Sequence, residues 1–234
     1  MRKLAVYSLL GCLSLLASAC NSDTDVESGD TEVEAPPFPE GQGQAPNASA
    51  VYPAGPYGIN PGSIVSNFKF VGFPTPDQGT DSAFNVSLSD FYNPTGTDVF
   101  PEGSPYGAGE PKPKALMVIV SAVWCGPCNQ EADQILPGKY DEYQPKGVEF
   151  LLNLADGPTQ GIPAEFKHLK NWVKKYETRF PAVVDPSYKL SALFQQNAFP
   201  ANMLIDTRTM EIVESIAGAP DAAFYAKVDK LVAE

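Results

Sequence analysis

Two cysteines separated by two residues, Cys125 and Cys128 in the segment Trp-Cys-Gly-Pro-Cys, constrain this chain more than any other feature. Residues 115–120 before them are apolar and rich in β-branched side chains, which predicts a buried parallel strand. Residues 129–136 after them predict a helix. The two thiols therefore lie where a strand passes into a helix N-terminus, in a loop short enough for a disulfide to form and break within it.

This position assigns different roles to the two thiols. A helix N-terminus presents unpaired N–H groups and a partial positive charge, and both stabilise a thiolate. We expect the pKa of Cys125 to fall from about 8.5 toward roughly 7 or below, which makes it the attacking nucleophile, with Cys128 as the shielded resolving thiol. The alternatives are a passive disulfide or half of a zinc site. Zinc would need two more ligands, and the chain has one histidine, His168.

The N-terminus predicts export. A basic start precedes an apolar core at residues 4–16, which is too short to span a membrane, and a small-residue cleavage site ends at Ala19. Residues 1–19 are therefore predicted to be a signal peptide. Cys20 directly after them resembles the bacterial lipobox cysteine, which is lipidated and anchors the protein, although Ala17 stands where Leu is usual. The alternative is ordinary cleavage that leaves a free thiol at Cys20.

Residues 20–55 are predicted to form a disordered tether. Between residues 21 and 50 the chain has seven acidic and no basic residues, together with Ser, Gly, Gln and Pro, so it has too little apolar surface to order itself. The formal net charge of -12 argues against nucleic acid as a partner and against electrostatic docking on anionic lipid. Membrane attachment is therefore expected through lipid alone. With Cys20 lipidated, only Cys125 and Cys128 remain as redox-active sulfur in the exported chain.

The Trp-Cys-Gly-Pro-Cys segment matches the active-site motif of thioredoxins, and the order of expected elements follows that fold. The long insertion after the active-site helix resembles the membrane-anchored TlpA and ResA-type reductases, in the branch that includes redoxin and peroxiredoxin-like domains. The resemblance covers residues 64–234. It implies an α/β protein with a thioredoxin-like fold at residues 56–234, in which helices flank a central mixed β-sheet with an N-terminal β-hairpin extension.

The remaining patterns complete this order. Alternating apolar positions predict a strand at residues 64–73. This lead-in resembles the N-terminal β-hairpin of redoxin domains, with residues 84–92 as its second strand and a short helical turn capped by Ser89. The Gly- and Pro-rich loop at 93–112 is expected to drape near the active site or to vary in position. The active-site helix is expected to kink or stop at Pro137-Gly138. Further strands are predicted at residues 148–154, 180–185, 202–206 and 210–216, and further helices at 162–176, 187–196 and 221–233.

Two carboxylates are candidates for moving protons between the thiols and water. Asp156 follows the second core strand, at the sheet edge where sites are built. ResA-type proteins have a Glu near the cysteines after an Asn-containing strand end, and residues 153–156 match that position with Asp in place of Glu. Thioredoxins instead have a buried Asp six residues before the first cysteine, where this chain has Ile119. Asp156 is therefore the first candidate and Glu131 the second. Alternatively, residues 156–158 form only a turn.

Pro200 matches the cis proline that thioredoxin-fold proteins hold opposite the dithiol. Such a peptide leaves the backbone of the preceding residue available to pair with an extended substrate segment. The family usually has a smaller β-branched residue before this proline and Thr after it, whereas this chain has Phe199 and Ala201, so substrate choice and redox potential stay open. The predicted substrate groove consists of Trp124, Gly126, Pro127 and Phe199.

Together these features predict an exported thiol-disulfide oxidoreductase, held by lipid on the periplasmic face of the inner or outer membrane. Its expected partners are protein disulfide substrates and a membrane-bound electron donor, and no cofactor is implied. Three alternatives stay open. One is a peroxiredoxin-like thiol peroxidase, which is disfavoured because Ala122 stands where peroxiredoxins have Thr; the others are a copper-binding protein and a redox-silent lipoprotein of the same fold. The sequence leaves the direction of electron flow open.

Overall fold

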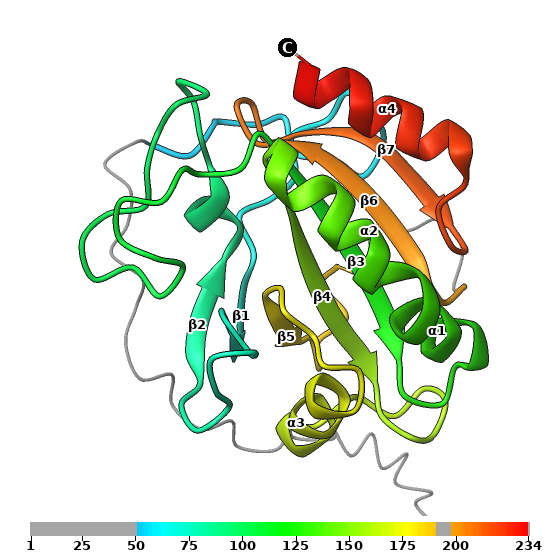
Figure 1. The fold of residues 1–234 in the computed structure, drawn as a ribbon. Helices are drawn as coiled ribbons and strands as arrows, with labels where there is room; N and C mark the ends of the chain where they lie inside the picture. The colour runs from blue at the N-terminus through cyan, green and yellow to red at the C-terminus, as the bar shows by residue number, and fades with distance from the viewer. Residues whose placement is uncertain (1–50, 191–197, 234) are drawn as a thin grey trace, which may run out of the picture. The chain divides into compact units, whose positions relative to one another are not determined.

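The computed structural model describes residues 51–190 and 198–233, all within the second of the two compact units into which the chain divides, residues 35–234. Seven strands form one sheet in the order β2-β1-β5-β4-β3-β6-β7 (Figure 1). β4 is parallel to its neighbours β3 and β5, and every other neighbouring pair is antiparallel, so the predicted mixed sheet is confirmed. The strands are β1 (Lys69–Phe73), β2 (Phe84–Ser87), β3 (Ala115–Ala122), β4 (Val148–Asp156), β5 (Ala182–Val184), β6 (Ala201–Asp206) and β7 (Glu211–Ala217).

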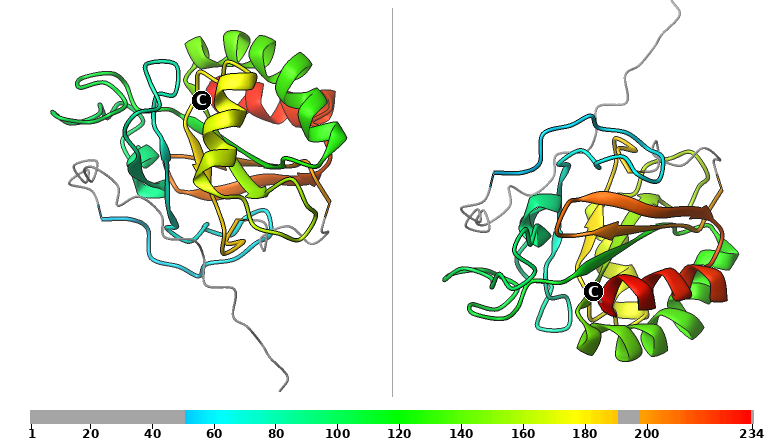
Figure 2. Two further views of the ribbon diagram at one scale, coloured as in Figure 1. Left: turned by 90° about the horizontal axis from the view of Figure 1, so that it is seen from below. Right: turned by 90° about the horizontal axis from the view of Figure 1, so that it is seen from above.

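The described α-helices pack on one face of the sheet, and the N-terminal lead and loops cover the other (Figure 2). Each face therefore has its own apolar core. The helical segments are the 3-10 turn η1 (Leu88–Phe91), α1 (Gly126–Gln130), the π-helical turn η2 (Glu131–Ile135), α2 (Leu136–Tyr143), the 3-10 turn η3 (Gln144–Lys146), α3 (Phe166–Lys175) and α4 (Ala222–Ala233).

The central strand β3 belongs to both cores. All 8 of its residues are buried, and successive side chains point to opposite faces. Met117 and Ile119 enter the core beneath the helices, whereas Leu116, Val118 and Val120 enter the other. Because both faces are covered, the strand reads as one continuous apolar run, and the prediction of a buried parallel strand is confirmed.

The active-site helix continues past Pro137, so of the kink or stop expected there the stop is wrong. α1, η2 and α2 follow one another without a break from Gly126 to Tyr143, and the N–H of Leu136 donates to the carbonyl of Glu131. Proline has no N–H, and in a helix interior its ring clashes with the carbonyl four residues earlier. The wider π-helical turn directly before Pro137 removes this conflict and keeps the helix intact.

The Gly- and Pro-rich loop lies at the end of β3 opposite the dithiol, so the expectation that it drapes near the active site is wrong. Asn93 holds its ends together by donating from Nδ2 to the carbonyls of Lys112 and Pro113, each at 3.1 Å. Tyr106 anchors its middle, with its ring centroid 5.1 Å from that of Phe91. The loop precedes β3 in the chain, and the dithiol follows β3. The 8 residues of this strand therefore separate the loop from the dithiol by about 26 Å, at about 3.3 Å per residue.

The N-terminal lead, residues 51–68, crosses the sheet face that the helices leave open (Figure 2). The hydroxyl of Tyr52 donates to the carbonyl of Val65 at 2.8 Å, and its ring lies 5.9 Å from that of Tyr92. The chain therefore contacts the domain from Tyr52 onward, a few residues inside the stretch predicted to be tether.

Several predictions fall on residues outside the described part of the chain. These are the signal peptide, Cys20 and most of the tether. The helix predicted at residues 187–196 is described only as far as residue 190, where the chain forms turns. No helix in the described ranges is long and apolar enough to cross a membrane.

Candidate active site

The two cysteines of the motif form a disulfide at the carboxyl end of β3. The bond joins Cys125 to Cys128, whose Cα atoms are 5.3 Å apart. Cys125 is the N-cap of α1, and its Sγ accepts a hydrogen bond of 3.1 Å from the backbone N–H of Cys128. The predicted passage from strand to motif to helix is confirmed. After reduction, the sulfur of Cys125 lies where a helix terminus stabilises negative charge.

Burial does not distinguish the two sulfurs in the disulfide form. Cys125 is 1% exposed and Cys128 is 0% exposed, so the predicted difference in shielding is small. Gly126 and Pro127 between them are exposed. The chemical difference between the two thiols therefore rests on the capping position of Cys125.

Asp156 lies at the same edge of the sheet as the motif, because it pairs with Ala122 at the end of the β3–β4 ladder. Its buried carboxylate accepts three hydrogen bonds. Oδ2 accepts from Trp124 Nε1 and from the N–H of Gly161, each at 2.8 Å, and Oδ1 accepts from the hydroxyl of Tyr188 at 2.7 Å. None of these donors is a thiol. The contacts make Asp156 an anchor for the motif tryptophan, and its role as a proton relay stays a prediction.

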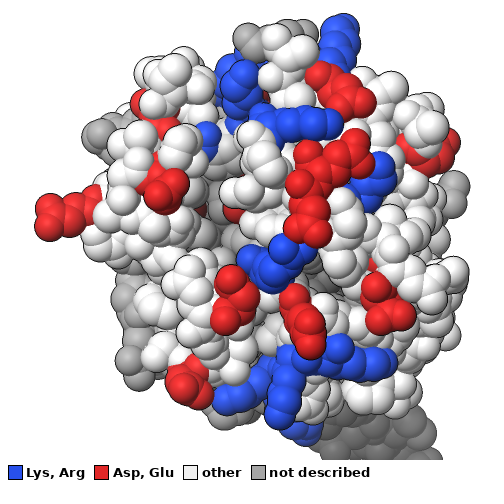
Figure 3. All heavy atoms as spheres, viewed as in Figure 1, with Lys and Arg blue, Asp and Glu red and all other residues white. Residues whose placement is uncertain are grey.

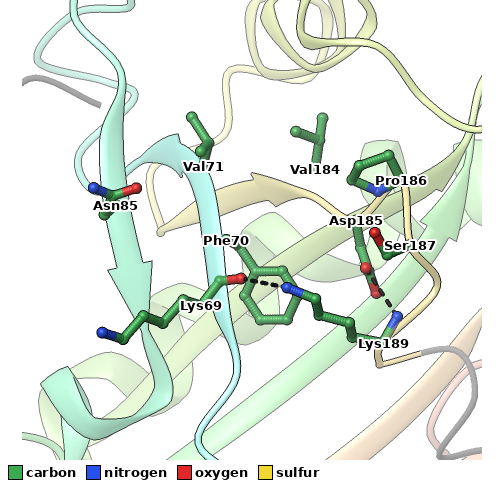
Figure 4. A pocket seen from close by; sticks show the side chains of 9 residues that line it. All are labelled: Lys69, Phe70, Val71, Asn85, Val184, Asp185, Pro186, Ser187 and Lys189. Carbon is green, nitrogen blue, oxygen red and sulfur yellow. Dashed lines mark hydrogen bonds between the residues drawn. The ribbon is translucent and has the colours of Figure 1, made fainter. Parts of the chain in front are cut away.

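Tyr188 reaches Asp156 from a backbone conformation that bulky residues rarely adopt, since its φ is 54°. The turn at residues 185–190 also forms one wall of a cavity of about 260 Å³ at β1, β2 and β5 (Figure 4). There Lys189 Nζ donates to the carbonyl of Lys69 at 3.2 Å. The turn thus connects this cavity with the carboxylate that holds Trp124.

Glu131 is a second buried carboxylate, one turn after Cys128 in the helix. It is 1% exposed, and its Oε1 accepts a hydrogen bond of 3.1 Å from Asn202 of β6. Its Oε2 has no hydrogen-bond partner among the described residues. Burial raises the pKa of Glu131 from 4.5 to about 7, and the hydrogen bond from Asn202 opposes this rise. A carboxyl with such a pKa exchanges protons readily near neutral pH.

Asn202, the hydrogen-bond partner of Glu131, lies next to the position at which thioredoxins have their buried Asp. Asn202 lies directly opposite Ile119 in the antiparallel ladder between β3 and β6. Side chains opposite each other in such a ladder share one face of the sheet, here the face covered by the helices. Glu131 thus supplies a carboxylate from the helix to the region in which Ile119 offers none.

The Phe199-Pro200 peptide bond is cis, as the resemblance implies. The ring of Phe199 meets Trp124 edge-on, with centroids 6.0 Å apart. The carbonyl of Pro200 accepts a hydrogen bond of 2.7 Å from the N–H of Gly218, whose own carbonyl accepts one of 3.0 Å from Asn202. A short network therefore links the Pro200 loop to the partner of Glu131.

Of the residues proposed from the sequence, Trp124 and Phe199 meet beside the dithiol, and Gly126 and Pro127 form its exposed turn. Sequence reasoning missed Asn129, Asn202 and Tyr188. Each of the three has a partner far away in the chain, which no local pattern could have identified. Asn202 nevertheless stands where a buried strand position is usually apolar. In the described part of the chain, no group of three or more His, Cys, Asp or Glu side chains could hold a metal ion.

Solved structures identify the class of fold. A putative thiol:disulfide interchange protein DsbE from Chlorobium tepidum matches with a TM-score of 0.52 and 18% identity, over 74% of this chain and 98% of its own. The thioredoxin domain of a thiol-disulfide oxidoreductase from Bacteroides vulgatus matches with a TM-score of 0.50 and 18% identity, over 74% of this chain and 98% of its own. The fold is therefore thioredoxin-like, as predicted.

Sequence comparisons show two further similarities of the chain. Residues 104–214 match the model of the AhpC/TSA family. A thiol-disulfide oxidoreductase ResA of Bacillus cereus is 29% identical over 117 residues, which cover 50% of this chain and 62% of that protein. The chain thus spans less than two thirds of this relative. The matches agree with the predicted resemblance to the ResA-type proteins of the thioredoxin fold.

Proposed function

We propose that this chain is an exported, membrane-tethered thiol-disulfide oxidoreductase that reduces disulfides in proteins. The observation that carries the proposal is the Cys125–Cys128 disulfide at a helix N-cap, where the N–H of Cys128 donates to the sulfur of Cys125. The resemblance to ResA supports the same class of reaction.

The reaction begins with the reduced dithiol. The thiolate of Cys125 attacks one sulfur of a substrate disulfide, so that a mixed disulfide forms while the substrate S–S bond breaks and the leaving sulfur takes up a proton. Cys128 then loses its proton and attacks Cys125, which releases the second substrate sulfur as a thiol. The substrate gains two electrons and two protons, and the chain is left with the Cys125–Cys128 disulfide. A membrane-bound dithiol donor returns the electrons and protons.

Glu131 takes the proton from Cys128 in this scheme. Residues three apart in a helix are neighbours on its surface, so the carboxyl and the resolving thiol lie on the same side. Its Oε2 is available as an acceptor among the described groups, and its pKa of about 7 suits proton transfer near neutral pH. The carboxylate of Asp156 already accepts three hydrogen bonds. Glu131 therefore replaces Asp156 as the first candidate.

The apolar rim of the dithiol suits an extended protein segment as substrate. Trp124 is 37% exposed and Ile162 is 57% exposed. Ile162 follows Gly161, whose N–H shares an oxygen of Asp156 with the Trp124 indole, so the two apolar side chains belong to neighbouring segments. Exposed apolar side chains beside a reactive group favour a protein surface over a small polar thiol.

The proposed tether explains how the domain meets a membrane-bound donor. In this proposal lipid on Cys20 holds the chain at the surface, and a disordered tether of roughly 30 residues would have a mean reach on the order of 30 Å. On the face viewed in Figure 3, acidic and basic side chains are interspersed. Several such groups form ion pairs, as Arg179 does with Asp141 at 2.8 Å. Such a mixed surface supports attachment by lipid rather than by charge, and it does not favour nucleic acid.

Reduction of insulin with dithiothreitol as the electron source tests the proposal. We expect the full chain to accelerate insulin precipitation and Cys125→Ser to lose this activity while it keeps the thermal unfolding midpoint of the parent. Full activity in Cys125→Ser would refute the proposal. Faster turnover of hydrogen peroxide than of insulin would also contradict it and favour the peroxidase alternative.

A further inference from the structure

The side chain of Asn129 joins the dithiol loop to the end of α3. Its Nδ2 donates to the carbonyl of Val123 at 3.1 Å and to that of Cys125 at 2.6 Å. Its Oδ1 accepts from Lys175 Nζ at 3.2 Å and from the hydroxyl of Tyr176. The NH2 group of this amide therefore binds the loop, and its oxygen binds two residues that lie 46 and 47 positions further along the chain.

The chemistry of these partners fixes the direction in which the amide points. The carbonyls of Val123 and Cys125 only accept hydrogen bonds, so they require the NH2 group. The ammonium of Lys175 only donates, so it requires the oxygen. Lys175 is also held over the ring of Tyr176, with Nζ 4.6 Å from the ring centroid. The ammonium is thus kept beside the loop although the side chain is exposed.

We infer that Asn129 is a positioning residue through which Lys175 increases the reactivity of Cys125. The inference rests on the proposed function and assigns a control to the same site. A cation on Oδ1 polarises the amide, which strengthens the hydrogen bonds that Nδ2 donates to the loop. Its charge also favours a thiolate at the neighbouring helix cap.

Nearby carboxylates act in the opposite sense. Glu131 on the helix and Asp156 at the end of β4 carry negative charge when ionised, and Asp133 lines the surface hollow that Lys175 also lines. Among these four side chains, Lys175 is the cation. Its neighbour Lys174 is also exposed on α3 and lines the same hollow, but it has no described bond to Asn129, so it provides a matched control with the same change in charge.

The alkylation rate of Cys125 by iodoacetamide, measured against pH in full-length chains that carry Cys128→Ser, tests the inference. We expect Lys175→Met to lower the rate below the pKa of Cys125 by about two- to fivefold, the range of an exposed charge interaction, and 1 M salt to reduce the difference. Lys174→Met should leave the rate within about 1.5-fold. Equal effects of the two variants, or none from Lys175→Met, would overturn the inference.

A double-mutant cycle separates positioning from simple charge. In an Asn129→Ala background, Lys175→Met should lose most of its effect on the pH profile of the alkylation rate, because the amide that links Lys175 to the loop is absent. An undiminished effect would contradict the role of Asn129. Neither measurement uses a protein substrate. A chain that fails to reduce insulin but keeps this dependence on Lys175 would therefore refute the proposed function and leave the inference intact. A chain that reduces insulin but whose Cys125 reactivity does not depend on Lys175 would refute the inference and leave the proposed function intact.

Discussion

The indole Nε1 of Trp124 donates a hydrogen bond of 2.8 Å to the carboxylate of Asp156, at the carboxyl ends of two neighbouring strands. The same carboxylate also holds Gly161 and Tyr188. This one buried group therefore fixes three separate segments around the dithiol. The orientation of the exposed Trp124 ring, and with it the apolar rim, depends on Asp156.

Replacement of Asp156 by Asn should disturb the rim without changing the dithiol itself. The variant places an NH2 group against donors, so at least one hydrogen bond to a charged group is lost, at a cost of about 1.5–3 kcal/mol in the free energy of unfolding. We expect KM for insulin to rise and the dithiol–glutathione equilibrium constant to stay within about twofold. Tyr188→Phe removes one of the three bonds and should give a smaller effect of the same kind. A large fall in the rate of substrate release from the mixed disulfide would instead support a proton-relay role for Asp156.

The stability of the oxidised chain should depend on pH through Glu131. Its pKa is raised from 4.5 to about 7 in the folded state, so folding favours the protonated form. Its stabilising contribution is complete below pH 4.5 and is lost as pH rises through about 7. Glu131→Gln should therefore match the parent at pH 4 and exceed its free energy of unfolding at pH 8 by on the order of 3 kcal/mol.

Glu149 provides the matched control for this prediction. Burial also raises the pKa of Glu149 to about 7, but this residue lies at the start of β4, away from the dithiol. Urea unfolding should show the same pH trend in Glu149→Gln. Only Glu131→Gln should slow the release of substrate from the mixed disulfide, in stopped-flow experiments at pH 7. Equal release rates in the two variants would argue against proton transfer through Glu131.

The motif and the apolar runs were sufficient to predict the core of this fold, because each is a local signal. β3 is buried on both faces and therefore appears in the sequence as a continuous apolar run, and the spacing of Cys125 and Cys128 is specific to a dithiol loop. The cis bond before Pro200 came from the family resemblance.

The features that the sequence did not reveal depend on contacts between distant residues. Asn93 holds the long loop at the far end of β3 by bonding to Lys112 and Pro113. The helix continues beyond Pro137 because a π-helical turn precedes this proline, and the periodicity of the side chains does not predict such a turn. The order of preference between Asp156 and Glu131 changed for the same reason, since a count of hydrogen bonds at each carboxylate requires the structure.

Phe199 should influence the choice of substrate. Its ring meets Trp124 edge-on at 6.0 Å, where the family usually has a smaller side chain. A protein substrate lying on the rim would contact this ring, and an aromatic contact of this kind contributes about 0.5–1.5 kcal/mol. We therefore expect Phe199→Ala to raise KM for insulin by about two- to tenfold and to leave the reduction of a small aromatic disulfide nearly unchanged. Equal losses with both substrates would indicate damage to the dithiol rather than to the rim.

The proposed lipid anchor predicts where the protein is found in the cell. Cys20 would carry the lipid, so the parent should enter the detergent phase of a Triton X-114 partition, and Cys20→Ala should stay in the aqueous phase. The variant should reduce insulin at the parental rate, since Cys20 lies outside the described domain. Detergent-phase partition of Cys20→Ala would exclude this anchor.

The most direct measurement is the capture of a reaction intermediate by Cys128→Ser. Without the resolving thiol, attack on a substrate disulfide should stop at a mixed disulfide. We expect mass spectrometry after incubation with insulin to find one covalently attached insulin chain, mapped to Cys125 and released by dithiothreitol. A chain that forms no such adduct, or forms it at another cysteine, would contradict the assignment of Cys125 as the attacking thiol.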